Sequence, residues 1–514
     1  MKTSSQGESA MSAIATISSL LSRRWMLNAA AALAVSVGML LAVSAAGPAY
    51  GQDKSTQLSK VERLNRAPVN KEVLRVTLPR PTEVKLANGL TVLLLENHKL
   101  PTVAFTMWIR PGQLADPQNL PGVASFTAQM LTEGTERRTS SQIASETDTL
   151  GATLDARSAF GTTYSVASAS GLNDSVPQLL DLLSDVVLHP SFPADEFAKF
   201  KQRELADLEQ RLSSPQFLGN QALRRTLYGD FPASITSATK ESINQMTVDD
   251  LKKFHDQHYV PSNAVVGVTG DFRTAEMQTL IEKYFGGWSG APEAAPAYPE
   301  EATNQAAKII LVDRPASVQT FIMAGTRGIR RADPEYYTLT VMNQVLGGGP
   351  QARLFLDLRE VHGYTYGVYS AFRSELYPGD WFAYTPVRTP VTDGSMTQLV
   401  YEFKKINDEL VPQTELEEAE RAIVARFALS LEQPSQILDS WLTVQHFGLP
   451  IDYWDKYPDH ISAVRSPAVQ SAAKRFVNLD HMQWICVGNR KQIQSVLEKY
   501  GPVSVVDADG KAEN

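Results

Sequence analysis

The chain has 514 residues, 43% hydrophobic and 20% charged, a composition typical of globular proteins and unlike that of disordered or fibrous ones. Its 48 Lys and Arg residues against 56 Asp and Glu residues give a net charge of −8, which argues against a dedicated nucleic-acid-binding protein. A single cysteine, Cys486, excludes an intrachain disulfide and any site built on two cysteines. The length predicts about two to four domains.

The first 51 residues have the pattern of a bacterial export signal. Arg23 and Arg24 precede an apolar run over residues 29–46, and the small residues near Ala49 and Gly51 offer a cleavage site. Paired arginines are typical of the twin-arginine route, with general secretion and an uncleaved membrane anchor as the alternatives. We expect cleavage and a periplasmic chain with no further membrane segment.

The rest of the chain contains an internal duplication. Five short motifs of different chemistry each occur twice, and the two occurrences are separated by nearly the same number of residues in every case. The alternative, two unrelated domains with a similar order of elements, would rarely produce such a match. The pairs are Asp116-Pro117 with Asp333-Pro334, Met130-Leu131 with Val345-Leu346, Pro215 with Pro434, Thr247 with Ser466, and Gly270 with Gly488.

The duplication and the distribution of prolines divide the chain into six predicted segments. Pro292, Pro296 and Pro299 exclude a regular helix or a central strand between the two copies, so a semi-extended linker is expected there. The segments are an export signal (1–51), an N-terminal arm (52–80), a first domain (81–289), the linker (290–306), a second domain (307–505) and a tail (506–514).

Strand-like and helix-like segments are mixed within each copy, which predicts an α+β fold with sheets packed against helices. The two copies have matching long helices, each followed by the matched proline, and matching short helices that precede a final strand. The predicted elements are strands at 90–96 and 103–109, a helix at 175–187, long helices at 194–212 and 413–431, short helices at 247–254 and 467–476, and strands ending at Gly270 and Gly488.

Two segments resemble one known family. Residues 122–135, Gly-Val-Ala-Ser-Phe-Thr-Ala-Gln-Met-Leu-Thr-Glu-Gly-Thr, resemble the zinc-motif helix of the pitrilysin and mitochondrial processing peptidase family, whose signature is His-x-x-Glu-His. The Gly-rich residues 346–349 and residues 353–360 resemble that family's second domain. The resemblance covers essentially the whole mature chain and implies two homologous domains in a clamshell-type assembly around a peptide.

The signature itself is degenerate. Aligned on the resemblance, its two histidines and its glutamate fall on Ser125, Gln129 and Ala128. Zinc needs imidazole or carboxylate ligands, and peptide hydrolysis needs a carboxylate to accept a proton from the metal-bound water. We therefore expect no metal in this chain.

Other candidate ligands are weak. The family's third ligand, a glutamate on the next long helix, would correspond to Glu204, with Asp207 and Glu209 as the alternatives, although a lone carboxylate there is more typical of a solvated helix. His255 and His258 could share a helical face, but they follow a short helix and we interpret them as structural or surface residues. The remaining histidines with no metal-binding pattern are His98, His189, His446, His460 and His481.

The second domain keeps another feature of the family. By resemblance, Arg359 and Tyr366 correspond to a pair that reaches the zinc site of the opposing domain and hydrogen-bonds the substrate. A guanidinium and a phenol are suitable donors to a developing oxyanion. The alternative is an ordinary ion pair of Arg359 with Glu360 and packing of Tyr366 in a sheet. Tyr364 is a competing tyrosine, and His362 is interpreted as exposed.

The resemblance then implies two subunits with separate roles. We predict the non-zinc-binding subunit of a periplasmic heterodimeric zinc endopeptidase, which supplies the Arg359 and Tyr366 clamp to a partner that carries His-x-x-Glu-His and the zinc. Its substrates would be unfolded peptides that add to a sheet edge. The alternatives are a non-catalytic peptide-binding or scaffold protein and a self-sufficient enzyme with relocated ligands.

Overall fold

A computed structural model describes residues 75–291, 297–299, 305–508 and 510–512. The predicted export signal, residues 52–74 of the predicted arm and most of the predicted linker lie outside these ranges. Within them, no helix combines the length and the apolar character needed to cross a membrane.

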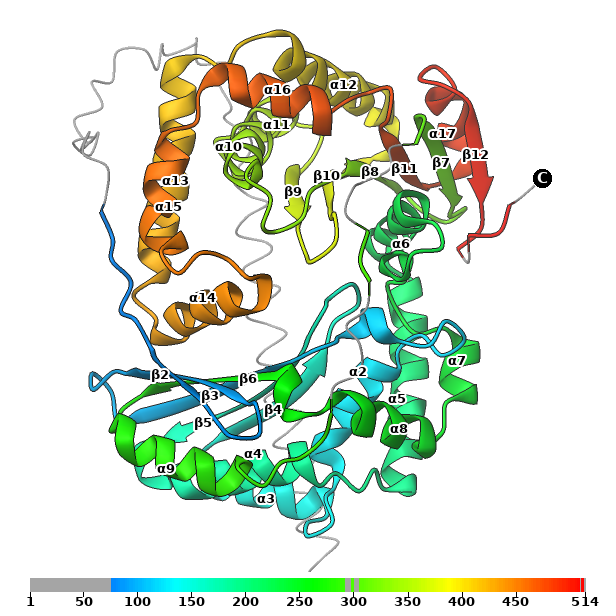
Figure 1. Cartoon of the computed structure of the whole chain (residues 1–514). Helices are drawn as coiled ribbons and strands as arrows, with labels where there is room; N and C mark the ends of the chain where they lie inside the picture. Colours follow the sequence, from blue (N-terminus) through cyan, green and yellow to red (C-terminus); the bar gives the residue numbers. More distant parts are fainter. Residues whose placement is uncertain (1–74, 292–296, 300–304, 509, 513–514) are drawn as a thin grey trace, which may run out of the picture. The chain divides into compact units, whose positions relative to one another are not determined.

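The described residues form two six-stranded sheets, each packed against helices (Figure 1). The first sheet has the order β1-β2-β6-β3-β5-β4 and the second has the order β12-β7-β11-β8-β10-β9. The first sheet contains β1 (Thr82–Lys85), β2 (Thr91–Glu96), β3 (Thr102–Ile109), β4 (Thr153–Ser158), β5 (Ser165–Leu172) and β6 (Ala264–Gly270). The second contains β7 (Lys308–Asp313), β8 (Gln319–Arg327), β9 (Tyr369–Arg373), β10 (Asp380–Arg388), β11 (Gln483–Gly488) and β12 (Val503–Val506).

Five strands of one sheet correspond in order and direction to five of the other. The pairs β2–β6 and β7–β11 are parallel, and the three following pairs in each sheet are antiparallel. Only the outermost strand differs, since β1 is antiparallel to β2 whereas β12 is parallel to β7. The predicted α+β fold with two homologous domains is confirmed.

The helices also recur in matching order. Those of the first half are α2 (Val123–Met130), α3 (Ser140–Thr149), α4 (Val176–Leu188), α5 (Ala194–Leu212), α6 (Pro215–Tyr228), α7 (Lys240–Gln245), α8 (Val248–His258) and α9 (Thr274–Phe285). Those of the second are α10 (Tyr336–Leu346), α11 (Arg353–Phe355) with a π-helical turn (Leu356–Val361), α12 (Thr392–Asp408), α13 (Gln413–Ser430), α14 (Pro434–Phe447), α15 (Tyr453–Ser462), α16 (Ser466–Phe476) and α17 (Arg490–Leu497).

One predicted helix is longer than expected. The helix predicted at 247–254 continues to His258, because Leu251, Phe254 and His258 recur at helical spacing on a buried face. Thr247 caps it through a capping box with Asp250. His255 and His258, predicted to follow this helix, therefore lie in its last turn.

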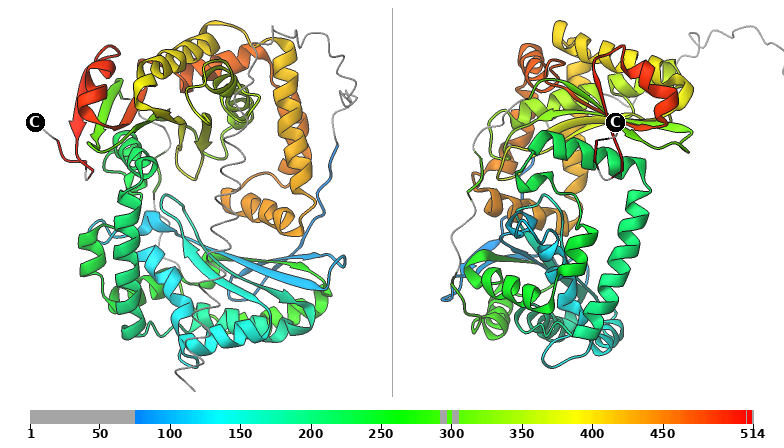
Figure 2. Two further views of the ribbon diagram at one scale, coloured as in Figure 1. Left: turned by 180° about the vertical axis from the view of Figure 1, so that it is seen from behind. Right: turned by 90° about the vertical axis from the view of Figure 1, so that its right-hand side faces the viewer.

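Each sheet is covered by a helix from the other half of the sequence. Helix α6 packs on β8 and β11, whereas α14 packs on β6 (Figures 1 and 2). A Cβ on Gly219 of α6 would lie 2.7 Å from Phe321 Cε1, and a Cβ on Gly267 of β6 would lie 2.7 Å from Leu438 Cδ1. Because each sheet needs a helix from the other half, the two copies pack as one unit.

The end of the predicted N-terminal arm contacts the second half of the chain. Leu78 is buried, and its N–H donates to Asp455 Oδ1 on α15 at 3.1 Å. The guanidinium of Arg80 binds the other carboxylate oxygen of Asp455 at 2.6 Å and lies over the ring of Trp441 on α14. These contacts connect residues before the first sheet to helices near the end of the chain.

Candidate functional site

The helix that corresponds to the zinc motif, α2, begins at a position that favours glycine. Gly122 has φ of +104°, and a Cβ there would lie 2.7 Å from the Cβ of Ala238. The carboxyl group of Asp116 accepts hydrogen bonds from the N–H groups of Gly122 (2.6 Å) and Ala124 (2.9 Å). Burial raises the pKa of Asp116 to about 7, although both hydrogen bonds act in the opposite direction.

The three motif positions on α2 do not provide a zinc site. Ser125 and Ala128 are buried and Gln129 is half-buried. The amide nitrogen of Gln129 donates to Ser125 Oγ at 3.1 Å, so these side chains, one helical turn apart, bind each other. A hydroxyl and an amide are poor zinc ligands, and the methyl group of Ala128 cannot accept a proton. The side chains present do not fit the zinc that the fold family implies.

Carboxylates on α5 do not complete a metal site either. Glu204 accepts a hydrogen bond from Arg211 at 3.1 Å, so it is already paired with a cation. Asp207 and Glu209 are exposed. Across the described ranges, no group of three or more His, Cys, Asp or Glu residues is placed to hold a metal.

The closely spaced histidines of α8 have structural contacts. Nε2 of His255 lies 2.8 Å from the carbonyl oxygen of Val187, and burial lowers the pKa of this histidine. His258 is also buried and packs edge-on against Phe254, with ring centroids 4.5 Å apart. These contacts support the interpretation of both histidines as structural residues.

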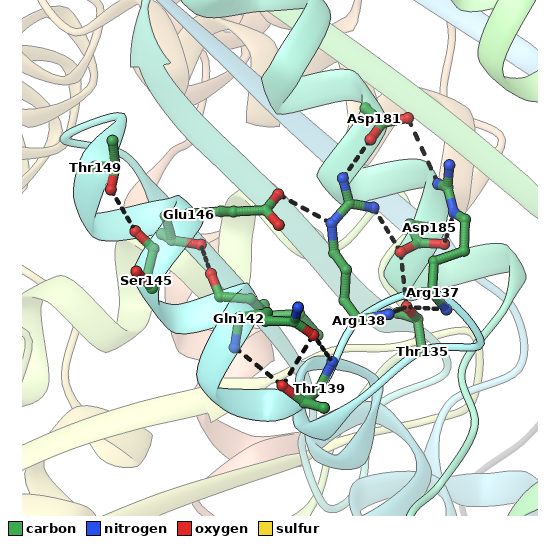
Figure 3. Close-up of polar contacts among 12 residues, drawn as sticks. Thr135, Arg137, Arg138, Thr139, Gln142, Ser145, Glu146, Thr149, Asp181 and Asp185 are labelled. Carbon is green, nitrogen blue, oxygen red and sulfur yellow. Dashed lines mark hydrogen bonds and ion pairs between the residues drawn. The ribbon is translucent and has the colours of Figure 1, made fainter.

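A cluster of ion pairs anchors the segment that follows α2 (Figure 3). Asp185 on α4 is fully buried and accepts hydrogen bonds from Thr135 Oγ1 (2.7 Å), Arg137 Nε (2.9 Å) and Arg138 Nη1 (2.7 Å). Asp181, one helical turn earlier, binds Arg138 as well. Burial alone would raise the pKa of Asp185, but the hydrogen bonds outweigh it and the net pKa is lowered. The motif helix is therefore followed by a firmly anchored segment.

Arg359 lies in the π-helical turn before β9 and forms the ion pair that the alternative interpretation expected. Its Nη1 lies 3.5 Å from Glu360 Oε1, and its guanidinium lies 4.7 Å from the ring centre of Phe355. The side chain is 41% exposed. His362, expected to be exposed, is instead half-buried, with Nδ1 3.4 Å from Asp357. The ring of His362 also lies 5.1 Å from the ring of Tyr364, and these two contacts cover its side chain.

Tyr366 lies in the loop between that turn and β9 and points into solvent. Its side chain is 91% exposed, so it does not pack in the sheet. Thr365 fixes the loop, because its Oγ1 donates to the carbonyl oxygen of Pro386 at 2.7 Å and accepts from the N–H of Gly367 at 3.1 Å. In the part of the chain that the structure describes, no hydrogen bond or ring contact joins Arg359 to Tyr366.

An aromatic pocket of about 540 Å³ lies beside Tyr366. Phe321 of β8, Tyr384 of β10 and Tyr369 of β9 form its apolar side, and residues 214–216 at the start of α6 complete it. No sequence pattern predicted this pocket. The sequence held only an indirect signal for it, namely aromatic residues that alternate along predicted strands. The helix that closes the pocket comes from the other half of the sequence, so spacing along the chain could not reveal it.

Both halves of the chain match sequence models of peptidase family M16. Residues 91–236 match the sequence model described as insulinase (peptidase family M16), and residues 245–423 match the one described as peptidase M16 inactive domain. A crystal structure described as the peptidase M16 inactive domain from Pseudomonas fluorescens has a TM-score of 0.74 and 28% sequence identity. It covers 80% of this chain and 98% of that one.

Some curated relatives are described as proteases, and one is described as a non-peptidase homolog. An uncharacterized zinc protease of Bacillus subtilis, YmxG, is 26% identical over 285 residues, or 55% of this chain and 68% of the relative. The non-peptidase homolog YmxG of Helicobacter pylori is 24% identical over 407 residues, or 78% of this chain and 92% of the relative. Alignments with the Bacillus protein and with uncharacterized zinc proteases of Mycobacterium leprae and Mycobacterium bovis span 65–68% of those proteins' lengths.

Proposed function

Because the chain belongs to peptidase family M16 and carries no zinc ligand at positions 125, 128 and 129, we propose that it is the non-zinc-binding subunit of a periplasmic heterodimeric zinc endopeptidase. A homologous partner with an intact His-x-x-Glu-His motif would bind zinc and supply the base. This chain would contribute Arg359, Tyr366 and half of the chamber that holds an unfolded peptide.

The observation that carries the proposal is the placement of Tyr366. Its phenol is 91% exposed beside an aromatic pocket, and its loop is fixed by Thr365. No hydrogen bond within the described ranges occupies its hydroxyl group. Such a group can donate to a substrate oxygen without first breaking an internal hydrogen bond, which is one requirement for stabilising a developing oxyanion; the exclusion of water, the other requirement, would come from closure of the partner over the peptide.

Arg359 would act as the second donor. Its ion pair with Glu360 is partly exposed and therefore contributes little to stability, so a substrate can replace Glu360 at low cost. A guanidinium that turns from this carboxylate toward a peptide oxygen would keep its packing on Phe355.

The second candidate is a non-catalytic peptide-binding or scaffold protein derived from a peptidase. The ion pair of Arg359 with Glu360 favours it, because an arginine with a resident partner needs no substrate to neutralise it. In this case the aromatic pocket beside Tyr366 would hold a peptide that is never cleaved.

Peptidase assays with zinc distinguish the two candidates. The chain is measured alone, then mixed with a homologue that carries His-x-x-Glu-His, as wild type and as Arg359→Ala or Tyr366→Phe. The proposal expects no cleavage by the chain alone, cleavage by the mixture, and a loss of about a hundredfold or more in kcat for each variant. Tyr401→Phe, on an exposed tyrosine of α12, is the matched control. Equal rates for Tyr366→Phe and wild type would contradict the clamp and favour the scaffold.

The periplasmic location is a separate part of the proposal. The pattern of residues 1–51 supports it, and the paired Arg23 and Arg24 are typical of the twin-arginine route. Cell fractionation followed by N-terminal sequencing of the mature chain tests it. We expect a periplasmic chain that begins near residue 52, and Arg23→Lys with Arg24→Lys should block export only if the twin-arginine route is used.

A further inference from the structure

A second pocket, of about 530 Å³, lies in the second half between α10, α13, α15 and the edge strand β9. Ser370, Ala371 and Phe372 of β9 line it, whereas Tyr369 lines the pocket beside Tyr366. Phe372 lies opposite Trp381 and Tyr369 opposite Tyr384, and these two β10 residues pack in different hydrophobic clusters. Because side chains alternate along a strand, the two pockets lie on opposite faces of the sheet edge. The volume is in the range of ordinary ligand sites.

This pocket is the counterpart, in the second copy, of the degenerate zinc motif. The match of Met130-Leu131 with Val345-Leu346 places Thr340, Asn343 and Gln344 at the motif positions of α10. All three line the pocket. The second copy therefore has a cavity at the position that corresponds to the zinc motif of the first copy. The residues that line this cavity differ in chemistry from the family's zinc ligands.

The pocket contains an arginine without an acidic partner. Arg426 on α13 has one hydrogen bond within the described ranges, a long one of 3.4 Å from Nη2 to Gln344 Oε1, and no ion pair there. Its helix neighbours one turn away are Ala422, Ile423, Leu429 and Ser430, none of which is acidic. The side chain is exposed. A positive charge is therefore available to a ligand.

The walls of the pocket are aromatic. Phe427 stacks on Trp454 with ring centroids 5.5 Å apart, and Tyr457 lies 5.1 Å from Phe427. On the other side Phe372 packs edge-on against Tyr336 at 5.3 Å. Such walls fit one large apolar side chain beside a carboxylate.

The outer edge of the strand beside the pocket is hydrogen-bonded at Ser370, and no backbone hydrogen bond within the described ranges occupies it at Phe372. Among the strands that the structure describes, β9 pairs with β10 alone. The outward N–H of Ser370 donates to the carbonyl oxygen of Gly347, and the carbonyl oxygen of Ser370 accepts from the side-chain amide of Asn343. Backbone orientation repeats every two residues along a strand, so Phe372 is oriented like Ser370. The N–H and carbonyl groups of Phe372 therefore face away from β10. An extended chain can therefore add to β9 at this position.

We propose that this pocket binds the carboxyl-terminal end of an extended peptide. The peptide backbone adds to β9 at Phe372, its last side chain, apolar, enters the aromatic walls, and its terminal carboxylate forms a bidentate pair with the guanidinium of Arg426. The binding requires only this chain and not the partner of the proposed function.

Fluorescence anisotropy of a labelled peptide tests the proposal on the mature chain. The probe is a decapeptide of alternating polar and apolar residues that ends in Phe. It is prepared in three forms: with a free carboxyl terminus, as the C-terminal amide, and as a C-terminal amide that carries one internal Asp. We expect the free acid to bind about tenfold or more tightly than the amide, because a charge-assisted bidentate pair is lost in the amide. Arg426→Gln should abolish this difference.

Arg421→Gln is the matched control, because Arg421 lies on the same helix but pairs with Glu417. It should retain the preference for the free acid. Equal binding of acid and amide by wild type, or an unchanged preference in Arg426→Gln, overturns the proposal. Binding of the internal-Asp amide as tightly as the free acid overturns the assignment to a terminal carboxylate.

The outcome is separate from that of the peptidase assays. Tyr366→Phe should leave the preference for the free acid unchanged, because Tyr366 is not part of this pocket. If Arg426→Gln fails to reduce binding while the mixture with the homologue still cleaves peptides, only the inference about this pocket is wrong.

Discussion

The hydroxyl oxygen of Thr163, in the first half of the chain, lies 2.8 Å from a carboxylate oxygen of Glu375 in the second half. The same hydroxyl lies 2.8 Å from Nε2 of His446 on α14. Burial raises the pKa of Glu375 to about 7, and burial together with the charge of Arg110 lowers the pKa of His446 to about 3. At neutral pH the imidazole of His446 is therefore neutral and the carboxyl group of Glu375 is near its titration point. Both contact the hydroxyl group of Thr163 and so connect the two halves.

This contact predicts a pH-dependent stability. A carboxyl group whose folded pKa lies above its unfolded value of about 4.5 binds more protons when folded, so the free energy of unfolding falls as pH rises from about 4.5 to 7. Glu375 keeps some solvent exposure and faces the charge of Arg224, so we expect an effect of about 1–3 kcal/mol, below the full shift. Glu375→Gln should remove this part of the pH dependence.

Denaturant unfolding at pH 5, 6, 7 and 8 measures the effect as the difference between wild type and Glu375→Gln. That comparison cancels the contribution of other raised carboxyl groups, such as Asp116. Glu360→Gln, on an exposed side chain, is the control and should keep the wild-type profile. A profile of Glu375→Gln identical to wild type would show that Glu375 is ionised throughout this range.

Gly219→Ala should destabilise the protein even though alanine favours helices. The substitution gains about 1 kcal/mol of helix propensity, but its Cβ would lie 2.7 Å from Phe321 Cε1, and overpacking costs about 1–3 kcal/mol. We expect a net loss of about 1 kcal/mol in the free energy of unfolding. The double variant Gly219→Ala with Phe321→Leu should show a favourable coupling in a double-mutant cycle, and additive losses would mean that the two residues do not meet.

The sequence predicted much of the fold, because the information lay in local patterns. The long helices at 194–212 and 413–431 are α5 and α13 within one residue, since apolar spacing and the following prolines define them. The packing of α6 and α14 on the opposite sheets had no such signal. Gly219 and Gly267 permit that packing, but a lone glycine in a helix or a strand has many explanations.

The candidate site was less predictable than the fold. The motif positions could be read from the resemblance, but the hydrogen bond between Ser125 and Gln129 and the pocket around Arg426 depend on side chains that meet only after folding. His446 stood alone in the sequence and proved to contact Thr163 from the other half. Contacts between residues more than 200 positions apart cannot be read from spacing.

Asp185→Asn should loosen the segment that follows α2. Asp185 is fully buried and accepts three hydrogen bonds, two of them from arginines. We expect a loss of about 1–3 kcal/mol at pH 7, less than for an isolated buried pair, because Arg137 is 54% exposed and Asp181 retains Arg138.

The pH dependence of this loss has a defined sign. The folded pKa of Asp185 is depressed, so its contribution is present above the unfolded value of about 3.8 and disappears as pH falls through the folded pKa. Thermal unfolding of wild type and Asp185→Asn should therefore converge below about pH 4. Glu146→Gln, at the exposed end of the same cluster, should cost less than about 0.5 kcal/mol. A constant difference between wild type and Asp185→Asn down to pH 2 would contradict this account.

Zinc analysis tests the chemistry of the motif positions directly. We expect the purified wild-type chain to hold well below one equivalent of zinc after dialysis, because Ser125, Ala128 and Gln129 offer no imidazole or carboxylate and Glu204 is paired with Arg211. Ser125→His with Gln129→His should bind zinc at least about tenfold more tightly than wild type, since the two side chains already meet at 3.1 Å across one helical turn. Either single substitution is the control and should gain much less. One tightly held equivalent in wild type that Glu204→Gln removes would instead mean that the chain binds zinc through ligands other than the motif, and the assignment of the metal to a partner would be wrong.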